Sequence, residues 1–388
     1  MESVQGISSL RWTVKIRILH VIATLDPAGA ENQLTRLVLN LDKARFSPLV
    51  CCLTRGGPLE EKLARGGVPY RILYKQGKCD PVALLKLTAL MRRFRPHVVH
   101  TWMFTSNAYG RTAAILAGAP IRVSTELSVD EWKWGPYRLV DRLLLRFTDA
   151  VIANAEAVKN FYVNRERVPP SKIILIRNGI ALNVFQPRPK QEARKRLGIP
   201  PAAQVIGGAG RLDPQKGFSF LLEAMPEVRK RRPDAMLVIA GEGAERGTLE
   251  GLAARLGLRD CVKLIGRTED MAGFMSSLDL FALPSVWEGL PHVVMEAMAC
   301  GCPVVAARVG GVSELIAEGV TGITVQPQCP KALAEGIVAL LEDDRARLGM
   351  GRKAHEVAQR DFDFMEMVRQ TEELYLLLME RRGVCVGS

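Results

Sequence analysis

Short runs of apolar residues alternate with longer amphipathic stretches along most of the chain. A run of four to eight apolar residues is typical of a buried strand, and apolar residues three or four apart indicate a helix. In the first half the predicted strands are 18–23, 46–53, 70–73, 98–101, 121–125 and 150–153. The predicted helices there are 31–41, 58–65, 82–93 and 106–117. Strands that alternate with helices in this way indicate a parallel sheet of right-handed βαβ units.

A second alternation follows a proline-rich, basic segment at 183–201, which is typical of a connector between domains. Its predicted strands are 205–208, 235–240, 262–265, 278–283 and 303–306. Its predicted helices are 218–230, 245–256, 291–299, 331–341 and 345–359, and a last helix covers 365–381. The sequence therefore predicts two doubly wound α/β domains in tandem.

The 388 residues agree with two domains, because one ordinary hydrophobic core rarely spans so long a chain. The net charge of +12 lies in the first half: residues 1–187 hold 27 Lys and Arg and 14 Asp and Glu, whereas residues 188–388 hold 26 and 27. A basic surface favours anionic lipid, phosphorylated substrates or nucleic acid, but no stacking platform or finger motif supports nucleic acid. The cysteines are scattered without zinc spacing, and no apolar run has signal-peptide or membrane-span length, so we expect a cytoplasmic protein.

The segment 210–217, GRLDPQKG, places two cations directly after a predicted strand. Arg211 and Lys216 are five residues apart across a turn, which can aim both side chains at one point. Two cations so placed can clamp a diphosphate, and the alternative is that both are ordinary solvated side chains. The glycines just before them lack the third glycine of G-x-G-x-x-G, which argues against a Rossmann dehydrogenase.

The segment 284–305, PSVWEGLPHVVMEAMACGCPVV, carries two carboxylates around a predicted helix start. Glu288 precedes the helix, and Glu296 lies a turn and a half into it. Two carboxylates at this spacing can contact different parts of one extended ligand. The alternative is an acid favoured by the helix dipole together with a surface glutamate.

Backbone groups of the same half supply further candidate contacts. Pro291 suits the first helical position, so the N–H groups of Gly289 and Leu290 would lie at a helix start, where phosphate and sugar oxygens bind. Gly241 begins a Gly-Glu-Gly turn after a predicted strand, which lets the backbone pass close to a ligand. A second glycine turn, at 310–314, precedes another helix. Taken alone, the Gly-Glu-Gly turn is equally well explained as a simple turn, and the turn at 310–314 is a weak signal.

Together these residues resemble family 4 of the retaining glycosyltransferases, which have the GT-B fold. The resemblance covers nearly the whole chain, and its most specific part is the Glu-x7-Glu signature of Glu288 and Glu296. It implies two Rossmann-like doubly wound domains facing each other across a cleft. It implies an N-terminal acceptor-side domain over 14–186, a C-terminal nucleotide-sugar domain over 187–364, and a helix over 365–384 that crosses back to the first domain.

The resemblance also implies roles for individual residues. Arg211 and Lys216 would bind the donor diphosphate and stabilise it as it departs. Glu288 would contact hydroxyls of the transferred sugar, and Glu296 would bind the nucleotide ribose. Gly29, in the loop DPAGAE, would lie near donor and acceptor. The other donor-binding positions that it implies are Gly241, Gly289 and Leu290.

One position departs from the family pattern. Many members carry a histidine near 124–128, where this chain has Leu127. His100, at the end of the predicted strand 98–101, is therefore a candidate catalytic group facing the cleft, and a structural imidazole is the open alternative. Glu126 is a weaker candidate.

The implied activity is transfer of a hexosyl group from a nucleoside diphosphate sugar to a hydroxyl of a glycan or lipid-linked acceptor. The resemblance implies retention of anomeric configuration and a role in cell-surface polysaccharide or glycolipid synthesis. Preorganised cations stabilise the departing diphosphate, so we expect neither a metal nor another cofactor. The base (UDP, GDP or ADP) stays open. The alternatives are a GT-B sugar-nucleotide epimerase or phosphorylase, and an inactive carbohydrate-binding scaffold.

The basic first half also contains a candidate membrane face. The stretch 131–146 mixes Trp, Tyr, Leu and Arg, and the stretch 84–95 adds four basic residues. Amphipathic basic stretches can lie in a lipid interface, so we expect a salt-sensitive peripheral contact with the inner face of an anionic membrane. The alternative is an ordinary helix packed on its sheet with a solvated basic side.

Overall fold

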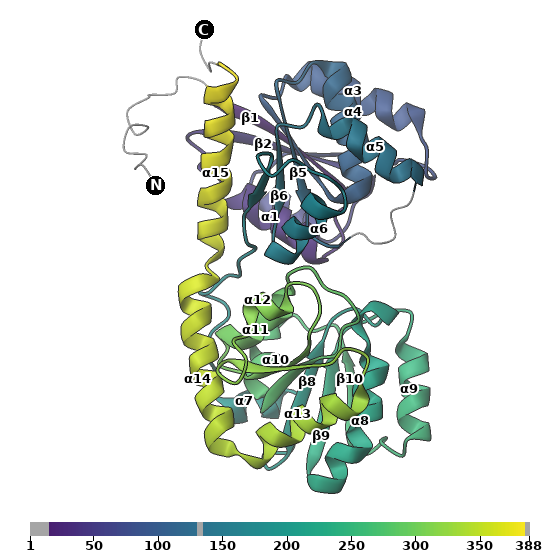
Figure 1. Cartoon of the computed structure of the whole chain (residues 1–388), viewed down its shortest axis with the longest axis vertical. Helices are drawn as coiled ribbons and strands as arrows, with labels where there is room; N and C mark the ends of the chain where they lie inside the picture. Colours follow the sequence, from purple (N-terminus) through teal and green to yellow (C-terminus); the bar gives the residue numbers. More distant parts are fainter. Residues whose placement is uncertain (1–14, 130–134, 385–388) are drawn as a thin grey trace. The chain divides into compact units, whose positions relative to one another are not determined.

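The structure is a computed structural model and describes residues 15–129 and 135–384. It divides into two compact units (Figure 1). Unit 1 contains Met1–Asn154, Lys159–Ile176 and Met367–Ser388, and unit 2 contains Ala155–Val158 and Arg177–Glu366. The main stretch of unit 2, Arg177–Glu366, thus takes in the segment that we expected to connect two domains.

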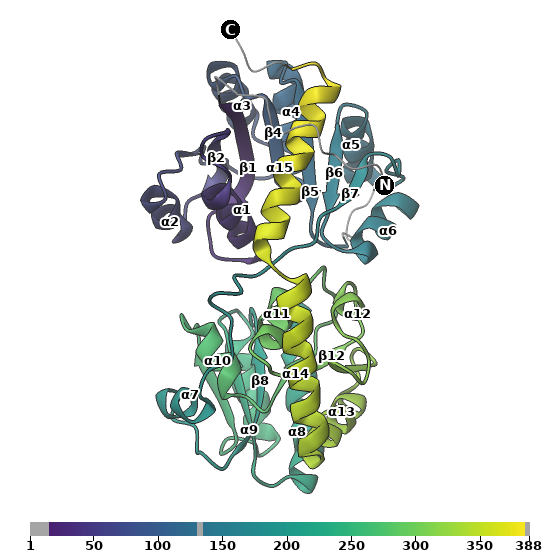
Figure 2. The same cartoon turned by 90° about the vertical axis from the view of Figure 1, so that its left-hand side faces the viewer.

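Unit 1 is built on a seven-stranded parallel sheet in the order β3-β2-β1-β4-β5-β6-β7 (Figures 1 and 2). Its strands are β1 (Ile16–Thr24), β2 (Phe46–Arg55), β3 (Tyr70–Ile72), β4 (Val98–Trp102), β5 (Ile121–Glu126), β6 (Ala150–Ala153) and β7 (Ile173–Leu175). Its helices are α1 (Gly29–Asn40), α2 (Leu59–Arg65), α3 (Pro81–Phe94), α4 (Met103–Ala117), α5 (Gly135–Leu145), most of α6 (Glu156–Asn164) and α15 (Phe364–Arg381). The strand order runs outward from β1 in both directions, which confirms the predicted doubly wound fold.

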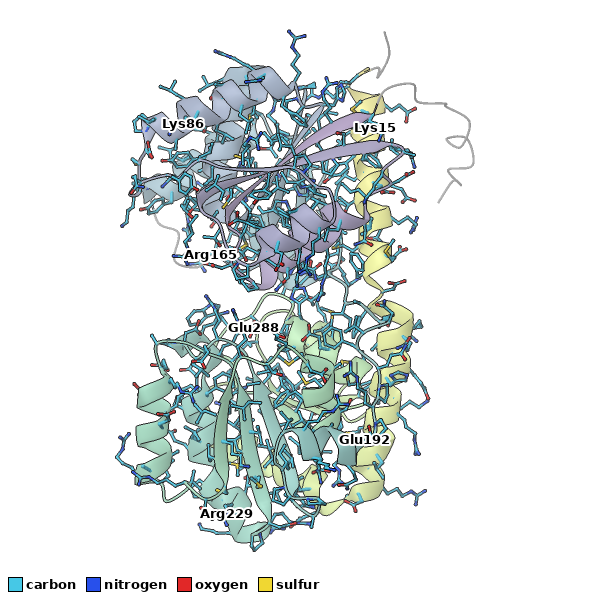
Figure 3. All side chains as sticks on the ribbon, turned by 180° about the vertical axis from the view of Figure 1, so that it is seen from behind. Lys15, Lys86, Arg165, Glu192, Arg229 and Glu288 are labelled. Carbon is cyan, nitrogen blue, oxygen red and sulfur yellow. The ribbon has the colours of Figure 1, made fainter. Side chains whose placement is uncertain are left out.

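Unit 2 holds a six-stranded parallel sheet in the order β10-β9-β8-β11-β12-β13. Its strands are β8 (Gln204–Ala209), β9 (Ala235–Ala240), β10 (Val262–Gly266), β11 (Leu280–Leu283), β12 (Val304–Ala307) and β13 (Gly322–Val325). Its helices are α7 (Lys190–Arg196), η1 (Pro214–Lys216), α8 (Phe218–Arg231), α9 (Arg246–Arg255), α10 (Met271–Ser277), α11 (His292–Ala299), α12 (Val312–Leu315), α13 (Pro330–Glu342) and α14 (Asp344–Asp361). Figure 3 labels Arg229 and Glu288 at opposite ends of this unit, and Glu288 lies where the strands end.

The two faces of the unit 1 sheet bury different side chains. Leu19 and Val21 of β1 pack in the apolar core with residues of α3 and α4. Successive side chains of a strand point to opposite faces, so His20 lies on the other face. There it is buried beside His100 of β4, and His100 meets Tyr375 of α15, with 5.8 Å between ring centroids. Figure 2 shows α15 lying across this face of the sheet.

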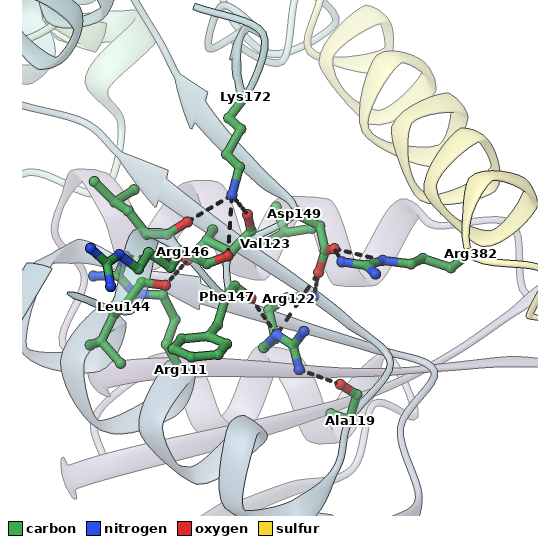
Figure 4. Close-up of polar contacts among 12 residues, drawn as sticks. Arg111, Ala119, Arg122, Val123, Leu144, Arg146, Phe147, Asp149, Lys172 and Arg382 are labelled. Atoms are coloured by element: carbon green, nitrogen blue, oxygen red, sulfur yellow. Dashed lines mark hydrogen bonds and ion pairs between the residues drawn. The ribbon is translucent and has the colours of Figure 1, made fainter. Parts of the chain in front are cut away.

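Polar contacts fasten α15 to the rest of unit 1 near its middle and just past its end. Near its middle, Glu372 Oε1 accepts a hydrogen bond from the backbone N–H of Asp42 at 2.7 Å. Just past its end, Arg382 Nε donates to Asp149 Oδ1 at 2.8 Å (Figure 4). The other oxygen of Asp149 accepts from the backbone N–H of Arg122 at 2.8 Å, so this carboxylate joins the helix end to the start of β5.

The segment 183–201, which we expected to connect two domains, lies within unit 2. It contains α7, whose Arg194 is buried. The guanidinium of Arg194 donates to Asp279 Oδ2 at 2.7 Å, to the carbonyl of Ser277 at 3.0 Å and to that of Pro201 at 2.7 Å. A buried charge needs such partners, so these contacts bind the segment into unit 2.

Candidate functional site

Four loops meet at the carboxyl edge of the unit 2 sheet, after β8, β9, β11 and β12. Ligands of open parallel sheets bind at this edge. The backbone hydrogen bonds between the loops are Leu212 N to Glu242 O (2.9 Å), Val286 N to Gln215 O (2.8 Å) and Gly311 N to Gly289 O (2.8 Å). The motifs that are separate in the sequence therefore form one surface in unit 2.

Glycine allows these loops to approach so closely. Gly241 has φ +154°, and a Cβ there would lie 1.8 Å from the carbonyl oxygen of Gly210. Gly310 has φ +49°, and its Cβ would lie 1.9 Å from the carbonyl oxygen of Glu288. Both positions exclude a side chain on steric and conformational grounds. The two glycine turns are thus places where one backbone packs on another.

Lys216 and Glu288 form an ion pair between the loops after β8 and β11. Lys216 Nζ lies 2.6 Å from Glu288 Oε1, and the hydroxyl of Ser285 donates to the same oxygen at 2.6 Å. The Lys216 side chain is 14% exposed and that of Glu288 6%. Asp213 caps η1 by accepting from the backbone N–H of Lys216 at 3.2 Å, which places the lysine at the end of that turn. A largely desolvated ammonium with a carboxylate partner is thus built into the site.

Arg211, from the same loop, is held differently. Its side chain is 65% exposed, and its Nη2 lies 3.0 Å from Asp213 Oδ2 and 3.1 Å from Gln215 Oε1. The side chain of Lys216 is thus mostly buried in its ion pair with Glu288, whereas that of Arg211 stays accessible at the surface. The two side-chain cations pair with different carboxylates, Arg211 with Asp213 and Lys216 with Glu288, and Gln215 links Arg211 to the β11 loop.

The helix after the β11 loop starts one residue later than predicted. Pro291 is the N-cap, with extended φ and ψ of −74° and 112°, and α11 begins at His292. Leu290 is buried. Glu296 is buried on α11, 9% exposed. Gly289 uses its carbonyl to accept from the loop after β12.

Gly29 belongs to unit 1, at the first residue of α1. Its loop is held by Asp26, whose Oδ2 accepts from Arg55 Nε at 2.9 Å. The N-cap position, Ala28, has an extended backbone and makes no side-chain capping bond. Gly29 therefore starts a helix whose first amides receive no cap from the side chain of Ala28.

The expectation that His100 faces a cleft is wrong. The side chain is fully buried between the sheet and α15. Its Nδ1 lies 2.6 Å from the Tyr375 hydroxyl, and its Nε2 lies 2.6 Å from Thr125 Oγ1. Burial lowers the pKa of His100 well below the ordinary value, so the ring is neutral. The structure shows a structural imidazole, the alternative that the sequence left open.

Glu126 is equally enclosed. One carboxylate oxygen accepts from Asn107 Nδ2 at 2.7 Å, and the other accepts from the Tyr162 hydroxyl at 2.9 Å. It lines a small cavity with the buried ion pair of Arg111 and Asp141. Both oxygens are engaged within unit 1, which indicates a structural role for this residue.

Sequence reasoning missed what Glu314 does. Its two carboxylate oxygens accept from the backbone N–H groups of Glu156 and Ala157, both at 2.8 Å. These are the first amides of α6, in the stretch Ala155–Val158 that belongs to unit 2. Carboxylates at helix starts are favoured by the helix dipole, but this partner lies 158 residues away in the chain and leaves no local signal.

Within residues 15–129 and 135–384, no group of three or more His, Cys, Asp or Glu side chains is placed to hold a metal ion. In the same residues, no helix combines the length and apolar character needed to span a bilayer.

Two family models match the chain in adjoining segments. Residues 27–184 match the model described as Glycosyltransferase Family 4, and residues 189–357 match the one described as Glycosyl transferases group 1. A D-inositol 3-phosphate glycosyltransferase of Thermobispora bispora is 32% identical over 358 residues, which cover 86% of this chain and 81% of that protein.

Solved structures are similar over nearly the full length. HepE of Anabaena, in complex with UDP and glucose, has a TM-score of 0.83 and 25% identity, covering 92% of this chain and 99% of that one. Sucrose-phosphate synthase of Thermosynechococcus elongatus has a TM-score of 0.80 and 24% identity, covering 95% and 100%. These matches confirm the predicted fold.

Proposed function

This chain belongs to the family 4 glycosyltransferases and has their GT-B fold, and from that premise we propose that it uses a nucleoside diphosphate sugar as donor. The proposed reaction is transfer of a hexosyl group to a hydroxyl of a glycan or lipid-linked acceptor, with retention of anomeric configuration. The ion pair of Lys216 and Glu288 across two loops of the unit 2 edge carries the proposal. It places a cation suited to a diphosphate beside a carboxylate suited to sugar hydroxyls.

A solved relative supports a choice of donor base. HepE was crystallised with UDP and with UDP-glucose, and we propose a uridine diphosphate sugar here as well. The relatives named D-inositol 3-phosphate glycosyltransferase make an inositol phosphate an acceptor to test beside glycan and lipid-linked acceptors. We propose that the product serves the synthesis of cell-surface polysaccharide or glycolipid.

Charge stabilisation accounts for the chemistry. The anomeric C–O bond to phosphate breaks while a bond to the acceptor oxygen forms on the same face, and the acceptor proton passes to the departing diphosphate. Negative charge grows on that diphosphate, so Arg211 and Lys216 stabilise the transition state more than the ground state. Glu288 would hold the sugar and Glu296 the ribose. The two cations also remove the need for a metal, which we propose is not used.

A thermal-shift panel of UDP-, GDP- and ADP-sugars tests the proposal. A ligand at 100 times its dissociation constant should stabilise the protein by about 2.7 kcal/mol. Arg211→Ala should reduce this shift, because UDP binds more weakly, and abolish turnover, with an unchanged melting temperature without ligand. Arg229→Ala is the matched control, because that arginine also pairs with an aspartate, Asp260, at the opposite end of unit 2 (Figure 3).

Normal turnover in Arg211→Ala, or no response to any of the three donor classes, would contradict the proposal. The anomeric configuration of the product, measured by proton NMR, tests retention separately. An inverted product would refute the front-face route and leave the donor assignment intact.

We also propose that unit 1 contacts an anionic membrane through the outer face of α5. Leu139 is 61% exposed and Leu143 49%, and Phe147 just beyond the helix is 51% exposed. Arg142 and Arg146 are exposed between them, so this face combines apolar and cationic side chains. Residues 131–134 of the stretch that suggested this face lie outside the described residues.

The exposed side of α3 has the same character. Val82 is 59% exposed and Leu85 66%, and they lie beside the exposed Lys86, which Figure 3 labels on the outside of the unit.

Leu139→Glu, on α5, should reduce sedimentation with anionic vesicles at low salt, and high salt should abolish sedimentation of the wild type. Leu348→Glu, at an exposed leucine of unit 2, is the control. Equal sedimentation of both variants would refute this face.

A further inference from the structure

The side chain of Gln215 bridges the loops after β8 and β11. Its Oε1 accepts a hydrogen bond from Arg211 Nη2 at 3.1 Å, and its Nε2 donates to the carbonyl oxygen of Trp287 at 3.1 Å. Its own carbonyl accepts from the backbone N–H of Val286 at 2.8 Å. Three bonds from one residue thus join Arg211 to the loop that carries Glu288.

The two partners fix the orientation of the amide. A guanidinium can only donate and a backbone carbonyl can only accept, so the Gln215 oxygen must face Arg211 and its nitrogen must face Trp287. A rotated amide would place two donors together and two acceptors together. The Trp287 carbonyl therefore determines that Gln215 presents an acceptor to Arg211.

Arg211 needs such support because it is exposed. An arginine side chain has about 2 kcal/mol of rotamer entropy to lose when it becomes ordered. Asp213 attracts the guanidinium at 3.0 Å but offsets part of its positive charge. A neutral amide orients the same group without adding negative charge where a diphosphate would bind. Gln215 is suited to this task, and a glutamate would not be.

We infer that Gln215 is a positioning residue for the donor diphosphate, which it serves by holding Arg211 in place against the β11 loop. The inference rests on the proposed function, since it needs Arg211 to bind the diphosphate. An arginine that is ordered before the ligand arrives loses less freedom on binding, so the affinity rises without a new contact to the ligand.

Titration of the full chain with UDP, followed by calorimetry, tests the inference. Gln215→Met keeps the length of the side chain and removes both amide bonds, and it should raise the dissociation constant about fivefold. Gln215→Glu should raise it further, because its carboxylate repels both the Trp287 carbonyl and the diphosphate. Gln204→Met is the matched control: its Nε2 also donates to a backbone carbonyl, that of Leu341, but at the start of β8. It should leave the constant within about twofold of the wild type.

A double-mutant cycle separates positioning from loop packing. If Gln215 acts through Arg211, then Gln215→Met should have no further effect in the Arg211→Ala background. An equal loss in both backgrounds would overturn the inference, because it would mean that Gln215 supports the loop itself. An unchanged dissociation constant for UDP in Gln215→Met, together with weaker UDP binding in Arg211→Ala, would also overturn the inference. If Arg211→Ala leaves UDP binding unchanged, the proposed donor clamp fails first, and the inference fails with it.

Discussion

Two buried histidines should make unit 1 less stable as the pH falls below neutral. Burial lowers the pKa of His20 to about 3. Burial, and then the charge of His20, lower that of His100 well below its ordinary value. A histidine in the unfolded chain titrates near pH 6.5. Below that pH the unfolded chain binds protons that the folded core does not, so the free energy of unfolding decreases as the pH falls through 6.5.

The size of the effect follows from the shift of His20. Between pH 7.5 and 5.5, this residue alone should remove about 1.4 kcal/mol from the free energy of unfolding. His100 adds a loss of the same sign, and so does His97, whose pKa is lowered by burial and then by Arg17. Glu372 opposes them, because burial raises its pKa and the folded state then binds its proton more readily. The net prediction is a loss of more than 1 kcal/mol.

Hydrogen exchange of the β1 and β4 peptides, corrected for intrinsic rates, reports this loss for unit 1 alone. His20→Leu should shrink the pH dependence by about 1.4 kcal/mol. Trp102→Phe is the control, since it removes the bond from the indole Nε1 to His20 Nδ1 (3.3 Å) but keeps the titrating ring. It should lower stability at both pH values equally. A full pH dependence in His20→Leu would refute the reasoning.

Three further outcomes are expected. Gly241→Ala should lower the free energy of unfolding by more than about 2 kcal/mol and weaken UDP binding, because the added Cβ meets Gly210. Gly247→Ala is the control, since its Cβ has open space around it, and it should be neutral or slightly stabilising. Denaturant melts measure the stability of both variants, and UDP titrations measure their affinity. Arg194→Ala should destabilise unit 2 by about 3–5 kcal/mol in a urea melt, because it removes a partner of the buried carboxylate of Asp279. Turnover should be unchanged after dialysis against EDTA, and recovery only on adding Mg²⁺ or Mn²⁺ would refute the metal-free mechanism.

The sequence predicted most of the helices and strands and the doubly wound fold class, but it gave no strand order and it missed several elements. It did not predict β7, β13 and α12, of three or four residues each, and it also missed α7 and α10, of seven residues each, and α6, of nine. A helical period is weak in one or two turns, and a strand of three or four residues has little alternation to detect, although β3, with three residues, was predicted. The elements that were predicted carry strong periodicity, and their ends agree with the structure to within a few residues.

Some residues of the candidate site could be predicted from local sequence, and others depend on distant parts of the chain. Arg211, Lys216 and Glu288 could be found because each lies in a glycine-bearing loop after a strand. His100 was misplaced because a strand residue has two faces to choose from, and the helix that covers its face lies 275 residues further along the chain. Gln215 gave no signal at all, since its importance depends on the Trp287 carbonyl in another loop.

The pairing inside the site decides which variant can test it. Lys216 and Glu288 are largely desolvated, so removal of either one leaves the other as a buried charge with a lost partner. Loss of activity in Lys216→Ala would therefore mix a weaker diphosphate site with a disturbed loop. Arg211 is exposed and its partners remain accessible to water, so its removal costs little folding energy. A fall in UDP affinity in Arg211→Ala at an unchanged melting temperature thus reports on the ligand alone, and Lys216→Ala can be interpreted only against that result.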